Sequence, residues 1–463
     1  MRYELDSNAR RDPQGTALFG GSPFRLIRLS PAGARMVDAW LAAEPVEMSP
    51  EASALQQRLV AGGLIHPIVA PANCADFGVV IPVYNDVDGL TLTLAAVRRE
   101  FPTVPIVVVD DSSTDLAAVV AVAAAGAAEV VRHELNQGPA AARNSGWRAL
   151  PDTTTAVVFI DSDAVPAPGS LRVLLGHLAD EAVTGVAPRV RARSGESLLD
   201  HYEAIESPLD LGSSPANVRP GSSVPYVPST MLVLRRSALN TAGGFDESLR
   251  VGEDVDLVWR VVRAGGVVRY EPAATAHHRN RSSWVALGRQ RHGYGTAVAA
   301  LDRRHSGDVA PIELAPETLA AWALAVFGGT PGLIGGLALA GRDAASLRNR
   351  LVHRVENPER ETMRLCAMSH AHAGRWLARA VTRTWWPFFL LASPLSRRAR
   401  RAAIAAVALP PLVSWWKKRP RLDPVSYTIA RTVDDAAYST GVWRGMIAER
   451  SLRPLLPRLA RRT

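Results

Sequence analysis

Cysteine is scarce in this sequence of 463 residues, and the signatures of several protein classes are missing. The two cysteines, Cys74 and Cys366, can form neither a Cys-type zinc site nor a disulfide framework. The amino terminus is charged and has no apolar stretch like that of a signal peptide, so we expect the chain to face the cytosol.

Two glycine-rich nucleotide-binding signatures are also absent. No Gly-x-Gly-x-x-Gly follows the first apolar strand expected in the α/β part, Val79–Val83, which counts against a dinucleotide-binding dehydrogenase. The sequence has no Gly-x-x-x-x-Gly-Lys-Ser/Thr, so it is not a P-loop enzyme.

Lysine is almost absent, yet the net charge is +9, because arginine supplies nearly all the basic residues. The only lysines are Lys417 and Lys418, and the basic residues concentrate after residue 340. Aromatic residues do not alternate with them as base-stacking residues would. We therefore expect a membrane surface as partner, at its cytoplasmic face, and no nucleic acid.

The most informative stretch is an apolar run, Ala156–Ile160, that ends at two carboxylates, Asp161 and Asp163. A short uninterrupted run of this kind predicts a strand buried on both faces of a parallel sheet. Residues i and i+2 of a strand point the same way, and like charges held together favour a bound cation such as Mg²⁺ or Mn²⁺. A solvated loop with two acids is the alternative.

Three apolar strands in this part of the chain end in acid or amide groups. The runs that end at Asn85, Asp111 and Asp161 alternate with helices, which predicts βαβ units and a mostly parallel sheet. Open sheets of this kind bind ligands at the carboxyl ends of their strands, so we expect an α/β fold with a ligand site there.

Five motifs in this order resemble family 2 glycosyltransferases with the Rossmann-like GT-A fold. The resemblance covers roughly residues 77–295, and its motifs are Val80–Asn85, Val109–Ser113, Asn136–Gly138 with Ala142–Asn144, Asp161–Asp163 and Gly252–Asp254. It implies a sugar-nucleotide donor and a Mg²⁺ or Mn²⁺ ion.

The resemblance also implies roles for single residues. Those of the donor site are Pro82, Tyr84, Asn85, Asp111, Arg143 and Asp161, with Asp111 accepting from uracil and Arg143 meeting the diphosphate. Asp163 would bind the metal. Either of two histidines could add a ligand, but adjacent extended residues face opposite ways, and we favour His278 over His277. A surface histidine satisfied by a hydrogen bond is the alternative.

Three acids in four positions open a predicted helix after Gly252. By resemblance Asp254 is the base that takes a proton from the acceptor hydroxyl, with Glu253 beside it, and direct attack inverts the anomeric carbon. Acids at a helix start also stabilise the helix, and we assign Asp256 that role. Ser229 and Thr230 are expected to form part of the acceptor floor.

The ends of the chain predict two further domains. Residues 1–70 show a strand, two helices opened at Ser30 and Ser49, and a returning strand, which is a winged-helix-like pattern. This domain could bind a peptide or only pack on its neighbour. A linker leads to the glycosyltransferase domain, 76–300, and a helical region, 301–463, follows.

The helical region contains two apolar blocks. Thr318–Gly341 has no charge over 24 residues, which is long enough to span a bilayer. The second block, Ala402–Trp416, has basic flanks and tryptophans that suit an interfacial anchor. Buried core helices are the alternative, and we expect membrane association with one or two inserted segments as a hypothesis.

The whole-chain pattern is similar to the glycosyltransferases of mycofactocin biosynthesis in actinobacteria. That similarity implies transfer of glucose from UDP-glucose to premycofactocin, a peptide-derived redox cofactor, to build a β-linked oligoglucoside. Two other functions stay open: a cell-envelope glycosyltransferase that uses a lipid-linked or polysaccharide acceptor, and a peptide-binding protein without catalysis.

Overall fold

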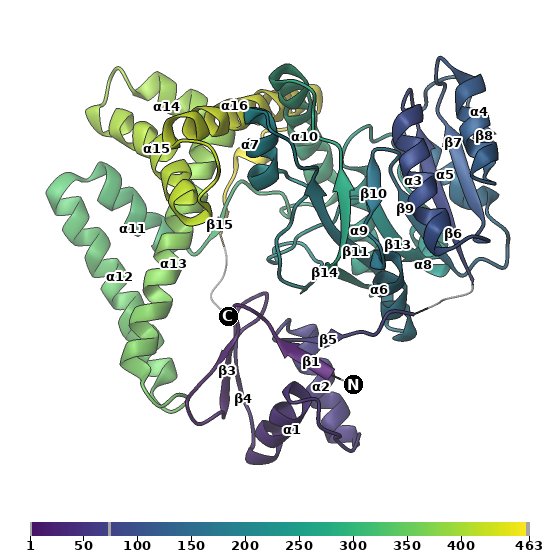
Figure 1. Ribbon diagram of the computed structural model, residues 1–463. Helices are drawn as coiled ribbons and strands as arrows, with labels where there is room; N and C mark the ends of the chain where they lie inside the picture. The colour runs from purple at the N-terminus through teal and green to yellow at the C-terminus, as the bar shows by residue number, and fades with distance from the viewer. Residues whose placement is uncertain (1, 73–75, 460–463) are drawn as a thin grey trace. The chain divides into compact units, whose positions relative to one another are not determined.

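The computed structural model describes residues 2–72 and 76–459 (Figure 1). Cys74 and the end of the predicted linker lie outside the described residues. The three domains expected from the sequence, divided near residues 70 and 300, stay a prediction.

Contacts divide the chain into two compact units. The first comprises the chain up to Gly195 together with Glu206–Asn280, and the second comprises Glu196–Ile205 together with the chain from Arg281 onward.

The N-terminal part has a core of its own, made by two helices and short strands. Ser30 and Ser49 accept hydrogen bonds from Gly33 N and Ala52 N and so cap helices α1 and α2, as the sequence predicts. Its elements are β1 (Arg2–Leu5), β2 (Arg10–Arg11), β3 (Ala17–Gly20), β4 (Arg25–Arg28), α1 (Pro31–Leu41), α2 (Pro50–Ala61) and β5 (Ile65–Ile68). Strands β2, β3 and β4 form an antiparallel sheet, β1 pairs with β5, and the sequence reading missed β1 to β3.

A mixed sheet forms the centre of the first unit (Figure 1). Four neighbouring strands are parallel, as predicted: β9, β6, β7 and β8. In spatial order the strands are β10 (Ala164–Pro166), β14 (Val267–His278), β11 (Val183–Ala192), β13 (Met231–Arg235), β9 (Ala156–Ile160), β6 (Phe77–Val83), β7 (Ile106–Asp110) and β8 (Glu129–Arg132), and β12 (Ala216–Asn217) pairs with β14.

Helices connect these strands and cover the sheet. They are α3 (Val87–Glu100), α4 (Leu116–Ala125), α5 (Pro139–Ala149), α6 (Ser170–Gly176), α8 (Arg236–Ala242) and α9 (Glu253–Arg263), with a short 3₁₀ turn η1 (His177–Ala179). Helix α5 packs very close to β6, because a Cβ at Gly146 would lie 2.3 Å from Val80 Cγ1. The chain passes from β6 to β7 on one side and returns to β9 on the other, which is the strand-order reversal where such sheets bind ligands.

The second unit is almost entirely helical. Its elements are α7 (Leu198–Glu206), α10 (Trp284–Arg304), β15 (Glu313–Leu314), α11 (Pro316–Phe327), α12 (Gly329–Leu351), α13 (Pro358–Ala380), the π-helix η2 (Val381–Trp385), α14 (Trp386–Ala392), α15 (Arg397–Lys418), α16 (Pro424–Ala448), η3 (Arg453–Leu455) and β16 (Arg458–Leu459). Three helices share a buried ion pair: Asp434 of α16 accepts from Arg291 Nε of α10 (3.0 Å) and from Tyr202 Oη of α7 (2.9 Å).

Thr318–Gly341, which is long enough to span a bilayer, does not form one continuous helix. Helix α11 ends at Phe327, and α12 begins after a glycine turn in which Gly329 has a φ of +65°. The two helices then pack together, because a Cβ at Gly332 would lie 2.3 Å from the Leu324 carbonyl oxygen. Over residues 2–72 and 76–459, none of the helices combines the length and the apolar character that crossing a bilayer needs.

The Asp434 ion pair generates a stability prediction. Asp434→Ala leaves the Arg291 cation buried without its carboxylate, so we expect the free energy of unfolding to fall by about 3–5 kcal/mol. Urea denaturation followed by circular dichroism measures this. The matched control is Glu359→Ala, which removes an exposed pair with Arg348 and should cost about 1 kcal/mol or less. Equal losses in the two variants would contradict the prediction.

Candidate active site

The loop that follows β6 and the loop that follows β7 are hydrogen-bonded to each other. Asn85, with a φ of +53°, accepts a hydrogen bond from Thr114 N (2.8 Å), and its own N–H donates to Ser113 Oγ (2.9 Å). Tyr84 is 54% exposed beside it. Pro82 lies within strand β6, inside the expected run Val79–Val83.

Asp111 follows β7 and is buried. Its Oδ1 accepts from Gln137 N (2.9 Å) and lies 2.9 Å from His133 Nδ1, while Oδ2 accepts from Gly138 N (2.8 Å). This carboxylate therefore holds the loop that opens α5. Since Oδ2 accepts one bond, it can accept a second, and recognition of uracil stays a prediction.

Arg143 of α5 is buried and joins two carboxylates. Its Nη2 lies 2.6 Å from Asp161 Oδ1 and its Nη1 lies 2.9 Å from Glu253 Oε1. The guanidinium also lies over the Phe245 ring, 5.5 Å from its centroid. Arg143 thereby links the end of β9 with the start of α9, and its contact with a diphosphate stays a prediction.

Asp163 and His278 form a second polar pair. His278 ends strand β14, which pairs with β10, and its Nε2 lies 3.2 Å from Asp163 Oδ2. His278 is buried and His277 is exposed, so the structure brings the preferred histidine to the carboxylate. Asp161 and Asp163 lie in the turn after β9, where strand alternation no longer applies, and they have different partners.

Asp163 and His278 could hold a metal ion whose remaining ligands are phosphate oxygens and water. Among residues 2–72 and 76–459 no group of three His, Cys, Asp or Glu side chains is arranged to hold an ion. Mg²⁺ and Mn²⁺ in phosphate-transferring sites commonly take one or two protein ligands and complete their shell with phosphate oxygens and water. Asp163 and His278 suit that arrangement, and they do not suit a site built from protein alone.

The predicted base lies at the start of α9, after Gly252 with its φ of +85°. Asp254 Oδ2 accepts from Ser229 N (3.2 Å), and Oδ1 accepts from Val255 N (2.8 Å). Burial raises the pKa of Asp254, although the Arg143 cation and the two N–H donors oppose the shift.

Glu253 is the second acid at this helix start. Burial and the Asp254 carboxylate raise the pKa of Glu253 to about 7, against the opposing effect of Arg143. Asp256, assigned to helix stabilisation, is buried and accepts from Arg260 Nε (2.8 Å) one turn later.

Ser229 and Thr230, the residues expected to form the acceptor floor, contact Asp254 and Asp161 through their backbone. Ser229 N donates to Asp254, and the Thr230 carbonyl accepts from Asp161 N (2.9 Å). Both side chains are buried, so contact with an acceptor stays a prediction.

Two arginines that the sequence reading missed lie beside these groups. Arg250 Nη1 lies 3.4 Å from Asn136 Oδ1 in the loop that Asp111 holds, and Arg279 pairs with Asp86, which also accepts from Ser162. Their positions next to the sequence motifs could have indicated them, because Arg250 stands two residues before Gly252 and Arg279 directly follows His278.

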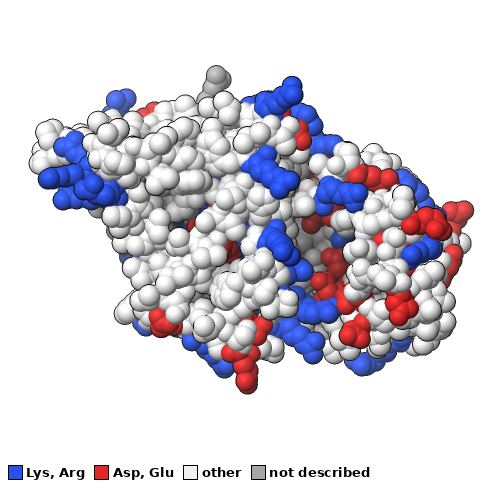
Figure 2. Space-filling view, turned by 90° about the horizontal axis from the view of Figure 1, so that it is seen from above, with Lys and Arg blue, Asp and Glu red and all other residues white. Residues whose placement is uncertain are grey.

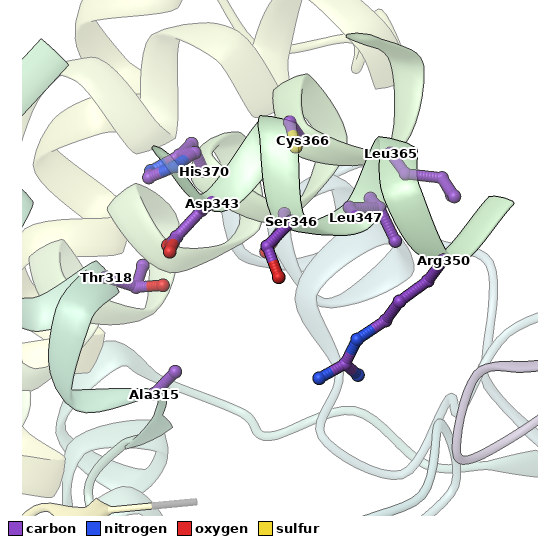
Figure 3. A pocket seen from close by; sticks show the side chains of 10 residues that line it. Ala315, Thr318, Asp343, Ser346, Leu347, Arg350, Leu365, Cys366 and His370 are labelled. Atoms are coloured by element: carbon purple, nitrogen blue, oxygen red, sulfur yellow. The ribbon is translucent and has the colours of Figure 1, made fainter. Parts of the chain in front are cut away.

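A separate cavity of about 380 Å³ lies in the second unit (Figure 3). Helices α11, α12 and α13 line it, with Asp343, Arg350 and His370 among its polar side chains. None of the residues of the candidate active site lines it, so it does not contribute to the chemistry described above.

A mixed sheet with acids at the ends of its parallel strands, together with a buried acid, Glu253, that opens α9, is the arrangement of a GT-A transferase. The family model described as "Glycosyl transferase family 2" matches residues 78–243. The chain belongs to this family, and it is a glycosyltransferase.

Two curated relatives differ in how much of the chain they cover. "Pre-mycofactocin glycosyltransferase" of Mycobacterium tuberculosis is 37% identical and covers 98% of this chain and 97% of its own. "Succinoglycan biosynthesis protein ExoO" of Rhizobium meliloti is 33% identical and covers 43% of this chain and 59% of its own.

Solved structures match more weakly. A complex of glucosyl-3-phosphoglycerate synthase from Mycobacterium tuberculosis with phosphoglyceric acid is 22% identical, covers 50% of this chain and 80% of its own, and gives a TM-score of 0.35. GalNAc-T7 with UDP, GalNAc and Mn²⁺ is 16% identical, covers 67% of this chain and 66% of its own, and gives a TM-score of 0.37. At these identities and TM-scores, neither structure indicates which residues of this chain bind a ligand.

The raised pKa of Glu253 predicts a pH-dependent stability. Between the ordinary value of 4.5 and about 7 the folded state holds a proton that the unfolded state has lost, so stability falls as pH rises. Relative to Glu253→Gln, we expect wild-type unfolding free energy to fall by up to about 3 kcal/mol over this window. Urea denaturation at several pH values measures the difference, and parallel curves for the two proteins would refute it.

Proposed function

We propose that this glycosyltransferase is inverting and metal-dependent, and that it transfers glucose from UDP-glucose to premycofactocin, adding further units to build a β-linked oligoglucoside. One observation carries the proposal for the chemistry. A half-buried carboxylate with a raised pKa, Asp254, lies in the field of Arg143 and Asp161, near the strand ends at which open α/β sheets bind ligands.

The acceptor assignment rests on the relative that matches along the whole chain. That relative is named for pre-mycofactocin and aligns with 98% of this chain, including the regions outside the catalytic domain. The succinoglycan proteins align with only 41–43% of the chain, so they give less support to a polysaccharide acceptor.

The proposed chemistry is a single displacement. Asp254 accepts the proton of the acceptor hydroxyl as that oxygen attacks the anomeric carbon of the donor. Its raised pKa makes Asp254 a stronger base than an exposed aspartate, and Ser229 N–H holds one of its oxygens in place. Attack on the face opposite to the leaving group turns an α-linked donor into a β-glycoside.

The donor would lie along the strand ends. Asp111, Asn85 and Tyr84 would contact the base, and Asp161 would lie near the ribose. Arg143 would lie towards the diphosphate, and the exposed Arg250 and Arg279 would offer further cations to it. A divalent ion held by Asp163 and His278 would neutralise the charge of the departing UDP.

Replacement of the base tests this assignment. We expect Asp254→Asn to lower kcat by about 10²–10⁴-fold while UDP binding is retained, because the amide keeps the shape and cannot accept the proton. Mass spectrometry of products from UDP-glucose and the acceptor, with Mn²⁺ or Mg²⁺, measures turnover. A panel of other UDP-sugars tests the donor, and unchanged turnover in the variant would rule out Asp254 as base.

The metal pair is tested by binding as well as by turnover. We expect Asp163→Asn and His278→Ala each to weaken Mn²⁺ binding in the presence of UDP by about tenfold or more. Electron paramagnetic resonance of Mn²⁺ measures the free ion. The matched control is His277→Ala, which removes the exposed neighbour, and an equal loss in this control would remove His278 from the site.

A further inference from the structure

The second unit carries a long segment without acidic residues. Residues 362–422 contain twelve Lys and Arg residues and no Asp or Glu, although the whole chain has a net charge of only +9. This segment includes α14, α15 and the part of α13 that follows its acidic first turn. The net charge of these residues, +12 from twelve basic and no acidic side chains, therefore exceeds the +9 of the whole chain.

The same segment exposes large apolar side chains. In α14, α15 and the turn between them the exposed fractions reach 73% for Leu391 and 90% for Leu395. The exposed apolar side chains of this surface, called here the α14–α15 surface, are Phe388, Leu390, Leu391, Leu395, Ile404, Leu409, Leu412 and Trp416. Figure 2 shows a broad uncharged face over these helices with basic side chains gathered at its left end.

The surface continues onto the end of α11. The rings of Phe327 and Phe389 lie 6.4 Å apart, and Arg398 donates to the Phe327 carbonyl oxygen (2.6 Å). Phe327 is itself 44% exposed. These two contacts place the exposed end of α11 against α14 and α15.

The position of the arginines indicates an external anion. Arg397, Arg398, Arg400 and Arg401 open α15, whose first turn contains no acid. Cations at a helix N-terminus oppose the helix dipole, so these charges do not serve the stability of α15. At the opposite end, Trp416 lies beside Lys417 and Lys418.

We infer that the α14–α15 surface docks on a bilayer that contains anionic phospholipids. Apolar and aromatic side chains would enter the headgroup region, and the basic residues at both ends of α15 would contact lipid phosphates. A helix of 22 residues is about 33 Å long and would lie in the plane of the interface, without crossing the bilayer. This inference concerns helices outside the catalytic cluster and does not depend on the proposed sugar transfer.

Flotation of the purified full chain with vesicles tests the inference. We expect binding to phosphatidylcholine vesicles that contain phosphatidylglycerol and at least tenfold weaker binding to phosphatidylcholine alone. The double variant Arg397→Gln, Arg401→Gln should bind anionic vesicles about 30-fold more weakly, at about fivefold for each arginine. The double variant Leu391→Asp, Leu395→Asp should lose at least tenfold.

Controls of equal size separate this surface from general effects. Arg350→Gln with Arg354→Gln removes the same charge from exposed positions before the segment, and Ile447→Asp with Leu452→Asp changes two exposed apolar residues after it. Both should bind like wild type, and circular dichroism checks the fold of all variants.

Three outcomes would overturn the inference. They are no vesicle binding by the wild type, equal loss in the control variants, and equal binding to vesicles with and without phosphatidylglycerol. Concentration-dependent self-association in sedimentation velocity, abolished by Leu391→Asp with Leu395→Asp in the absence of vesicle binding, would assign the surface to a second copy of the chain.

Discussion

The arrangement of the active site depends on one buried cation. Arg143 reaches from α5 to Asp161 at the end of β9 and to Glu253 at the start of α9, and Glu253 lies 110 residues from Arg143 along the chain. Removing one partner from such a pair leaves a buried charge without compensation, so the three groups stabilise one another only together. The close contact of Gly146 with Val80 brings α5 near enough to the sheet for this link.

Electrostatics then sets the properties of the neighbouring acids. Two carboxylates lie side by side at the start of α9, and burial disfavours the charge of each, so their pKa values rise. A single guanidinium cannot compensate both of them fully. The pKa of Glu253 consequently rises to about 7, and the raised pKa of Asp254 suits the role of base proposed for it.

Local sequence patterns predicted much of this molecule. The strand Ala156–Ile160 and the helix caps Ser30 and Ser49 were confirmed, because burial and capping depend on residues close in sequence. The partners of Arg143 could not be predicted, since spacing along the chain does not show which distant carboxylate a buried cation meets.

The missed features have equally physical causes. Thr318–Gly341 forms two helices, α11 and α12, that pack closely at glycines, and the lack of charge alone does not distinguish such a hairpin from a membrane span. Strands β1 to β3 are two to four residues long, too short for alternation to show. Roles for Asn85, Asp111, Ser229 and Thr230 stay predictions, because they concern molecules that bind there.

The bonds of Asp111 limit how this enzyme could change its donor. The same carboxylate that would face the base also accepts the Gln137 and Gly138 N–H groups at the entrance to α5. A substitution that alters the hydrogen-bonding pattern offered to the base would leave one of these amides without its acceptor and loosen the helix that carries Arg143. In the proposed donor site, nucleotide preference would therefore be tied at Asp111 to the integrity of the cluster around Arg143, and a new preference would have to evolve through other residues.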